Sequence, residues 1–231
     1  VKDLDNKKIF NSNQNVQILE NVRFFKGEKD NCEKLGKKIA DLCDLYVFDA
    51  FGCSHRKNAS TYSAIIKSKK ACMGLLMEKE LINLNQALLQ GERPYLSIIG
   101  GSKVSTKLEL IENIIQKADK IIVGGGIANT FLKASGFEVG NSLHEPSMVK
   151  FACKILEHKK IVLPKYVFVS KSFDDPISKL KKIDEVDKTD MILDIYFSKN
   201  MKDIVMNAKT IIWNGPMGVF ENENYKKGTE D

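Results

Sequence analysis

The chain has 231 residues, 43% of them hydrophobic, and a formal net charge of +6. This composition is ordinary for one large or two small globular domains, and no apolar run reaches the ~20 residues of a membrane span, so no membrane is expected as a partner. Acidic residues are interspersed among the basic ones, which indicates a solvated surface and not a nucleic-acid-binding face. The cysteines are odd in number and form no C-x-x-C pair, which disfavours disulfides and a zinc site and favours the cytoplasm.

The first part of the chain predicts two strands that each lead into an arginine. Residues 1–15 lack periodicity and are expected to be irregular. An apolar run at 16–19 leads to Arg23, and a buried-strand run at 45–51 leads to Arg56, with a helical pattern at 30–43 between them. Ligands of open α/β sheets bind at the carboxyl ends of strands, and guanidinium groups bind carboxylates or phosphates through a bidentate fork. Both arginines are therefore candidate anion-binding residues, with ordinary surface arginines as the alternative.

The longest predicted helix covers residues 75–90. Its apolar residues recur at helical spacing, Gly91 is a suitable C-cap, and Pro94 prevents continuation. Residues 57–71, which precede it, predict a loop with a short helix. If the chain has two domains, this helix is the best bridge between them.

Residues 94–107 predict a strand, a tight turn and a helix. The apolar run at 95–99 ends at Gly100-Gly101, and the helix is expected to begin around 102–105. Two glycines let the backbone approach an anion, and unpaired N–H groups at a helix start favour phosphate. Lys103 and Lys107, four residues apart, would share one helix face. An ordinary turn with two solvated lysines is the alternative, and the G-x-x-x-x-G-K-[ST] loop is absent.

A second strand, glycine and helix unit follows at residues 120–133. Two such units in series predict a crossover and a parallel sheet. The glycines 124–126 do not complete the dinucleotide fingerprint, because Asn129 stands where its last glycine is needed. Three glycines would give a flat ring such as adenine a floor free of side chains, and close helix–strand packing is the alternative.

The last third of the chain predicts helices at 145–158 and 199–208 and strands at 160–163, 166–170, 191–195 and 210–213. Residues 171–190 are charged and rich in turns. The final strand runs into the loop Asn214-Gly-Pro216-Met-Gly218-Val-Phe-Glu221. The carboxylate of Glu221 could hold a ribose, and a helix-capping glutamate is the alternative.

These segments together resemble one enzyme family. L-E-N-V-R-F, D-A-F-G-C-S-H-R, L-M-E-K-E-L, G-G-S-K-V-S-T-K, G-G-G-I-A-N-T-F and W-N-G-P-M-G-V-F-E occur in the order and approximate spacing of phosphoglycerate kinase, from about Val16 onward. The resemblance implies an α/β fold of two doubly wound parallel-sheet domains joined by a bridging helix. Residues 1–74 would be part of the phosphoglycerate-binding domain, 75–90 the interdomain helix, and 91–231 the nucleotide-binding domain.

The resemblance also implies roles for single residues. Arg23 and Arg56 match the phosphoglycerate-binding arginines, and Lys103 and Lys107 match the lysines that contact the transferred phosphoryl group and the nucleotide phosphates, with Lys103 as the catalytic residue. Gly124, Gly125 and Gly126 match the adenine floor, and Glu221 matches the ribose contact. The remaining implied nucleotide-binding residues are Gly101, Asn214, Pro216 and Gly218.

The chain also departs from the family pattern. It lacks the V-D-F-N and H-L-G-R segments and the C-terminal G-G-G-D-[ST] loop, so both domains are expected to be incomplete and no metal ligand is predicted. M-I-L-D-I-Y-F replaces the usual M-G-L-D-I-G-P, which places Ile192, Tyr196 and Phe197 where glycines and a proline line the nucleotide cleft.

The predicted function is reversible phosphoryl transfer between 1,3-bisphosphoglycerate and ADP, giving 3-phosphoglycerate and ATP, with Mg²⁺. The resemblance implies a cytoplasmic monomer with small-molecule substrates and no nucleic-acid partner. The alternative is a degenerate, non-catalytic nucleotide-binding or interaction protein on the same scaffold.

Overall fold

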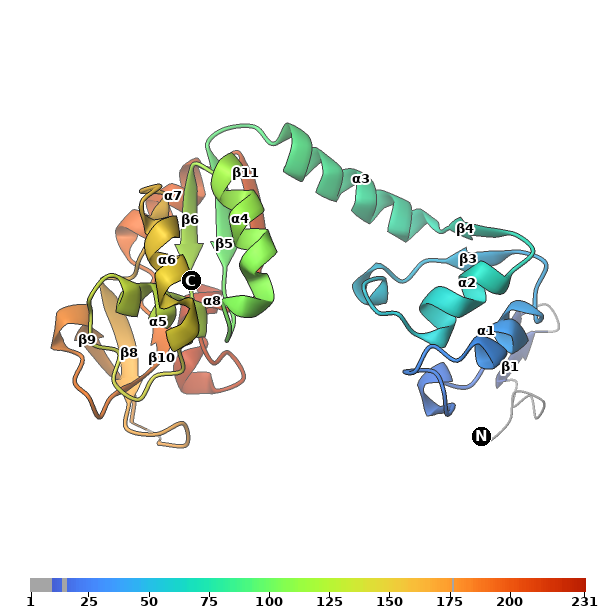
Figure 1. Cartoon of the computed structure of the whole chain (residues 1–231), viewed down its shortest axis with the longest axis horizontal. Helices are drawn as coiled ribbons and strands as arrows, with labels where there is room; N and C mark the ends of the chain where they lie inside the picture. The colour runs from blue at the N-terminus through green and yellow to red at the C-terminus, as the bar shows by residue number, and fades with distance from the viewer. Residues whose placement is uncertain (1–9, 14–15, 176) are drawn as a thin grey trace. The chain divides into compact units, whose positions relative to one another are not determined.

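The computed structural model describes residues 10–13, 16–175 and 177–231, and the chain divides into two compact units, Val1–Gln86 and Ala87–Asp231 (Figure 1). The boundary falls inside α3 (Leu75–Gln90), the helix that the sequence predicts. Within these described ranges, no helix combines the length and apolar character that crossing a membrane requires.

The first unit contains two small sheets. β1 (Phe10–Asn13) and β2 (Val16–Ile18) pair antiparallel, and β3 (Tyr46–Phe48) pairs parallel with β4 (Ala71–Met73). The prediction of an irregular segment is therefore wrong for residues 10–13, whereas residues 1–9 and 14–15 lie outside the described part. The sequence also missed β4, because a three-residue strand with all its residues exposed leaves no alternation of apolar and polar residues.

Short helices complete this unit. They are α1 (Glu33–Ala40), α2 (Ala64–Lys67), the π-helix η3 (Ala59–Ser63), and the 3₁₀ turns η1 (Val22–Phe24) and η2 (Phe51–Cys53). Its buried apolar core is small and joins α1 to the η3–α2 segment through Leu35, Ile39, Ala59 and Ala64.

The second unit is built on a parallel sheet with the strand order β11-β5-β6-β7. The strands are β5 (Tyr95–Ile99), β6 (Lys120–Val123), β7 (Ile161–Val162) and β11 (Thr210–Asn214). The predicted parallel sheet and the crossover from β5 to β6 are confirmed. Because the strands are parallel, the loops after β5, β6 and β11 meet at one edge of the sheet.

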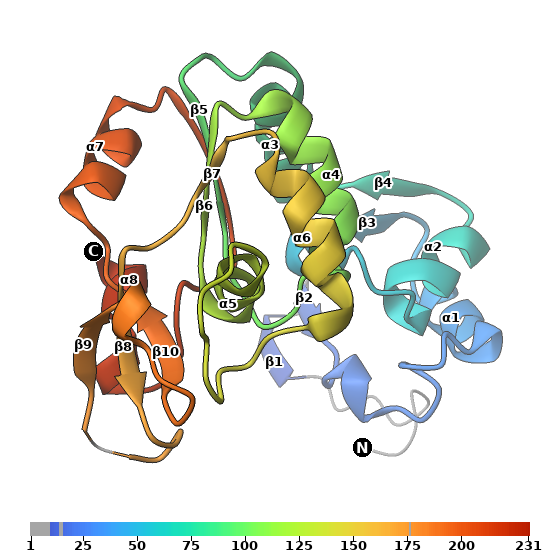
Figure 2. The ribbon, with the colours of Figure 1, turned by 60° about the vertical axis from the view of Figure 1, so that its left-hand side comes forward.

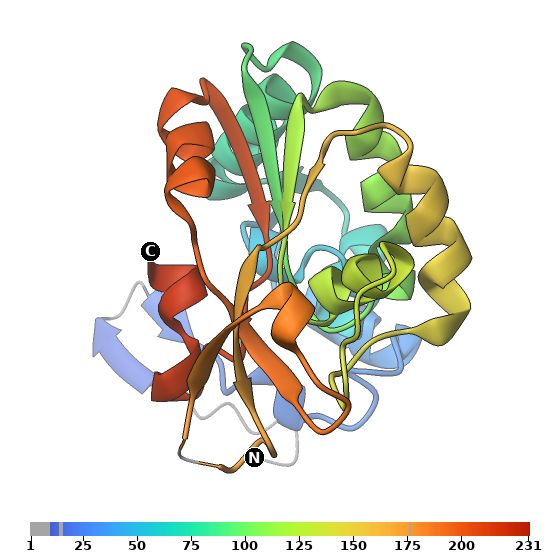
Figure 3. The same ribbon diagram turned by 90° about the vertical axis from the view of Figure 1, so that its left-hand side faces the viewer.

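Helices cover both faces of this sheet, as Figures 2 and 3 show. Alternate residues of β5 point to opposite faces: Tyr95 and Ile99 pack with one helical layer, and Leu96 and Ile98 with the other. The first layer holds α4 (Leu108–Lys117), α5 (Gly125–Ala134) and α6 (Val149–Leu156), and the second holds α7 (Lys199–Asn207). Two apolar cores therefore fix the sheet edge where the three loops lie.

A second, antiparallel sheet lies beside the first in the order β10-β8-β9. It consists of β8 (Tyr166–Ser170), β9 (Lys179–Lys182) and β10 (Met191–Ile195). The sequence predicted no pairing for these strands, so the antiparallel sheet is an addition to the expected α/β fold with parallel strands, and β9 lies in the charged segment 171–190. Parallel pairing needs a long crossover, whereas the described residues of the connections between these strands contain no helix other than the short turn η6 (Ile183–Glu185).

The remaining elements are the 3₁₀ turns η4 (Ser105–Lys107), η5 (Pro146–Met148) and η7 (Glu223–Tyr225) and the short helix α8 (Lys227–Glu230). The turn η4 leads into α4. The turn η5 leads into α6. The helix α8 packs behind the loop that follows β11.

Candidate functional site

Three loops contact one another through their backbones at the carboxyl ends of β5, β6 and β11. Gly100 donates its N–H to the carbonyl of Asn214 at 2.9 Å, and Gly125 donates to Met217 at 2.6 Å. Ile127, in the first turn of α5, donates to the carbonyl of Gly101 at 3.1 Å. These bonds join the three glycine motifs into one structure.

The glycines serve packing as well as openness. A Cβ atom at Gly124 would lie 2.6 Å from Cα of Met217, and one at Gly100 would overlap the carbonyl of Pro216. Gly124, predicted as part of an adenine floor, is therefore required by the contact with the β11 loop. Gly101, Gly125 and Gly126 line a cavity, but a Cβ atom at Gly125 would lie 2.7 Å from the carbonyl oxygen of Gly101, and one at Gly126 would overlap the carbonyl of Ser102. Close packing therefore applies to these glycines as well, and the adenine floor stays a prediction.

The cavity has a volume of about 950 Å³, and its lining is mostly apolar. Six of the predicted nucleotide-binding residues contribute to its wall: Gly101, Gly125, Gly126, Pro216, Gly218 and Glu221. Glu221 is exposed, and its carboxylate is the charged group among the residues that line the cavity. A pocket of this size and character suits a flat, partly polar ligand.

Other lining residues were not predicted. Phe173 comes from the segment between β8 and β9, and Asn129 comes from α5. Both belong to elements whose spatial neighbours a single sequence does not reveal. The remaining unpredicted lining residues are Ser102, Asn141, Leu143, Met191, Leu193, Val219 and Phe220.

Of the three residues that the sequence places at the nucleotide cleft around β10, one lies at this cavity. Ile192 lines the cavity. Phe197 is buried in the apolar core beneath α7, and Tyr196 makes an edge-to-face contact with Tyr166. Neither of these two aromatic residues is among those that line the cavity, because β10 ends at Ile195 and the chain turns towards α7.

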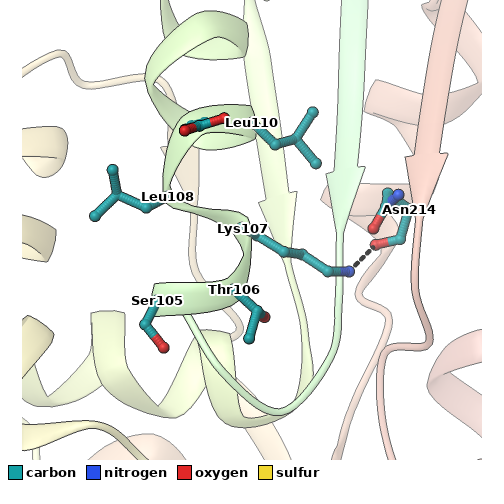
Figure 4. A pocket seen from close by; sticks show the side chains of 7 residues that line it. Ser105, Thr106, Lys107, Leu108, Leu110 and Asn214 are labelled. Carbon is teal, nitrogen blue, oxygen red and sulfur yellow. Dashed lines mark hydrogen bonds between the residues drawn. The ribbon is translucent and has the colours of Figure 1, made fainter. Parts of the chain in front are cut away.

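Lys107 lies across the ends of two strands. Its Nζ donates to the carbonyl of Gly100 at 2.5 Å and to that of Asn214 at 3.0 Å, as Figure 4 shows for the second bond. Both Lys107 and Asn214 line a second cavity of about 600 Å³. Burial lowers the pKa of the Lys107 ammonium group. A half-buried cation held by two carbonyls at a glycine loop is well placed to receive a phosphate.

The helix start predicted around 102–105 is met only at Ser105, the last residue of that range, where the 3₁₀ turn η4 begins. The turn η4 spans Ser105–Lys107 and α4 begins only at Leu108, so Lys103 and Lys107 do not share one helix face. The backbone N–H of Ser105 is also not free, because it donates to the carboxylate of Glu145 at 2.9 Å. Glu145 therefore occupies part of the anion site that the sequence suggested, and the exposed Lys103 lies near it.

The two candidate arginines lie in the first unit. Arg23 is in η1, where its backbone N–H donates to Oδ1 of Asn21 at 3.0 Å. Arg56 follows η2, and its carbonyl accepts a bond from the hydroxyl of Thr61. Both side chains are exposed, so both guanidinium groups are accessible to a ligand.

The described residues do not fit a magnesium site built by the protein. Within residues 10–13, 16–175 and 177–231, no group of three or more His, Cys, Asp or Glu side chains could hold a metal ion. We therefore assign no magnesium ligand to these residues.

Comparison with known proteins identifies the family. The profile of phosphoglycerate kinase matches residues 2–231. The chain belongs to the phosphoglycerate kinase family. Members of this family are transferases that act on small molecules, and the alternative of a non-catalytic scaffold protein is not favoured by these comparisons.

Two relatives show the extent of the match. The phosphoglycerate kinase of Nitratidesulfovibrio vulgaris is 48% identical over 221 residues, which cover 92% of this chain and 56% of the relative. That of Baumannia cicadellinicola is 46% identical over 232 residues, which cover 100% of this chain and 59% of the relative. The chain thus spans a little over half the length of the curated relatives that it matches.

Solved structures of phosphoglycerate kinases agree with the fold. The structure from Coxiella burnetii has a TM-score of 0.73 at 42% identity, covering 91% of this chain and 57% of that one. The structure from Pyrococcus horikoshii has a TM-score of 0.76 at 31% identity, covering 92% of this chain and 57% of that one.

Proposed function

We propose that this chain carries the nucleotide site and part of the phosphoglycerate site of a phosphoglycerate kinase. The reaction would be reversible transfer of the acyl phosphoryl group of 1,3-bisphosphoglycerate to ADP, giving 3-phosphoglycerate and ATP. The observation that carries the proposal is the 950 Å³ cavity lined by glycines of three separate motifs at the carboxyl ends of parallel strands. Nucleotides bind at such edges in α/β sheets.

The nucleotide would lie across this edge. Gly125 and Gly126 would form the floor beneath the adenine, and the Glu221 carboxylate would accept hydrogen bonds from the ribose hydroxyl groups. Lys107 would exchange its bonds to the carbonyls of Gly100 and Asn214 for bonds to the phosphates. Because burial disfavours the charged ammonium group, an incoming phosphate would be attracted strongly.

The phosphoryl transfer itself requires little covalent chemistry from the protein. An oxygen of the β-phosphate of ADP forms the new bond to phosphorus as the bond to the acyl oxygen breaks, and charge spreads over the three equatorial oxygens. Lys103, which is exposed beside the glycine loop, would neutralise part of this charge. Arg23 and Arg56 would hold 3-phosphoglycerate by bidentate bonds. Mg²⁺ would accompany the nucleotide, and the proposed setting is a cytoplasmic monomer.

Calorimetric titration of ADP into the purified 231-residue polypeptide tests the proposal. We expect saturable 1:1 binding, and no binding at millimolar ADP would return the chain to the alternative of a degenerate scaffold. A coupled assay on the same sample is expected to show turnover at least about 10³-fold below the ~1–100 per second of ordinary kinases. The reason is that this polypeptide lacks the V-D-F-N, H-L-G-R and G-G-G-D-[ST] motifs.

A further inference from the structure

The carboxyl group of Asp194 is buried behind the loop that closes the cavity. Asp194 lies in β10, and only 1% of it is exposed. Its Oδ2 accepts the backbone N–H of Gly228, in α8, at 2.8 Å, and its Oδ1 accepts the N–H of Ile195 at 2.9 Å. One side chain thus ties β10 to α8.

The same carboxyl group contacts the β11 loop. A Cβ atom at Gly218 would overlap Oδ1 of Asp194, and so would one at Gly228. Only glycine therefore lets the loop and α8 approach this oxygen together. Gly218 lines the cavity, as do the three residues that follow it, so the carboxyl group supports the cavity wall from behind.

Three further bonds hold the same loop in the same place. The N–H of Val219 donates to the carbonyl of Leu193 at 2.9 Å, and the N–H of Met217 donates to Oγ1 of Thr229 at 3.0 Å. The carbonyl of Met217 in turn accepts the N–H of Gly125. The loop is thus fixed between β10 and α8, and a shift of the loop would also move Gly125, which is bonded to it.

Burial of the Asp194 carboxylate at this position is energetically unfavourable. Among the described residues no cation pairs with Asp194. The charged group that faces it is Asp231, at the end of α8. Asp231 is also negative, and it is paired with Lys202. Burial raises the pKa of Asp194 to about 6, although the N–H groups of Gly228 and Ile195 oppose the shift. A buried carboxylate without a counter-charge costs stability, so stability does not explain this residue.

We propose that Asp194 is a positioning residue for the nucleotide site: its ionised carboxylate sets the position of the 216–221 loop, and through it the affinity for the nucleotide. The second half of this statement rests on the proposed function, because it takes the ligand to be a nucleotide. The first half concerns the loop alone and can be tested without a ligand.

Trp213 provides the ligand-free measurement. It is the single tryptophan of the chain, it precedes the loop, and its indole N–H donates to the carbonyl of Gly215 at 2.7 Å. In Asp194→Asn, an amide N–H₂ group replaces one of two acceptors that face backbone N–H groups, so the loop must shift. We expect a changed emission maximum and changed acrylamide quenching of Trp213. Asp203→Asn, which removes the same charge from the exposed face of α7, should change neither.

Titration of ADP into the same proteins tests the second half. At pH 8 we expect Asp194→Asn to raise the Kd for ADP about tenfold relative to the wild type. At pH 5, where Asp194 is protonated, this ratio should approach one, and titration of the ADP phosphates cancels in the ratio. Thr229→Val, which removes another tie to the loop, should also raise the Kd, but equally at both pH values.

The possible outcomes distinguish the positioning role of Asp194 from the proposed function of the chain. Unchanged Trp213 emission and an unchanged Kd in Asp194→Asn would overturn the positioning role while leaving the proposed function intact. A pH-independent ratio would likewise overturn it, since a merely structural aspartate predicts that result. If Trp213 responds as expected but the wild type binds no ADP, the loop role stands and the proposed function fails.

Discussion

Glu145 accepts two hydrogen bonds from Ser105, one from the backbone N–H at 2.9 Å and one from Oγ at 2.6 Å. The two residues are 40 positions apart, and the contact joins the segment before α6 to the turn before α4. Partial burial raises the pKa of Glu145. The hydrogen bonds from Ser105 and Val104 and the charge of Lys103 lower it by more, so the pKa lies below its ordinary value. The turn η4, which follows the glycine loop, is therefore held by an internal anion.

Removal of this carboxylate should destabilise the second unit. In Glu145→Ala, the N–H of Ser105 loses its acceptor, and loss of such a cap typically costs about 1 kcal/mol. For a domain of this size, we expect the melting temperature to fall by roughly 2–4 °C. Glu112→Ala, on the exposed face of α4, should leave it unchanged. An equal shift in both variants would mean that the contact with Ser105 contributes nothing to stability.

Lys107 should contribute directly to nucleotide affinity. Lys107→Ala removes a charge-assisted bond to phosphate, so ADP binding should weaken by ~1 to 3 kcal/mol in calorimetry. Lys179→Ala removes an exposed lysine of β9, away from both cavities, and should have almost no effect. Similar losses in the two variants would assign no phosphate contact to Lys107.

The arginines of the first unit should act on the other substrate. Arg23→Lys and Arg56→Lys keep the charge but lose the planar fork, so the Kd for 3-phosphoglycerate should rise while the Kd for ADP stays constant. Arg93→Lys is the matched control, because Arg93 is paired with Asp119 in the second unit. Loss of ADP binding in Arg56→Lys would point instead to a role in folding.

Much of the fold could be predicted from local patterns. The helix α3 and the strands β5, β6 and β11 carry strong periodicity and clear glycine or proline boundaries, and the structure has all four. The strand β9 could not be predicted, because Lys179–Lys182 has three lysines, and its support comes from pairing with β8 and from the ion pairs of Lys181 with Asp187 and Asp190. Strands whose support comes from contacts outside the strand leave little trace in their own sequence.

The site was predictable to a similar degree. Glycine motifs after strands indicate close backbone approach, and Gly101, Gly125 and Gly218, which the sequence predicts to bind nucleotide, line the cavity. The glycines at 100 and 124 look the same in sequence, yet they pack against the β11 loop. Glu145 was read only as part of a helix, since nothing local shows that its carboxylate meets Ser105. Distinguishing such roles requires knowing which backbone lies opposite.

The buried carboxyl group of Asp194 should give stability an identifiable pH dependence. Its pKa is raised by burial from 3.8 to about 6, so between these values the unfolded chain releases a proton that the folded chain retains. Stability must therefore fall as pH rises through this window and stay lower above it. The difference corresponds to roughly 3 kcal/mol of unfolding free energy.

Asp194→Asn removes this proton and isolates its effect from that of other carboxyl groups. Urea unfolding of both proteins between pH 4 and pH 7.5 gives the difference in unfolding free energy at each pH. We expect the variant to gain up to roughly 3 kcal/mol relative to the wild type as pH rises from 4 to 7, with most of the change between pH 4 and 6. A constant difference across this range would show that Asp194 titrates normally. A gain in stability together with weaker ADP binding would mean that this carboxylate is retained for the site at the expense of the fold.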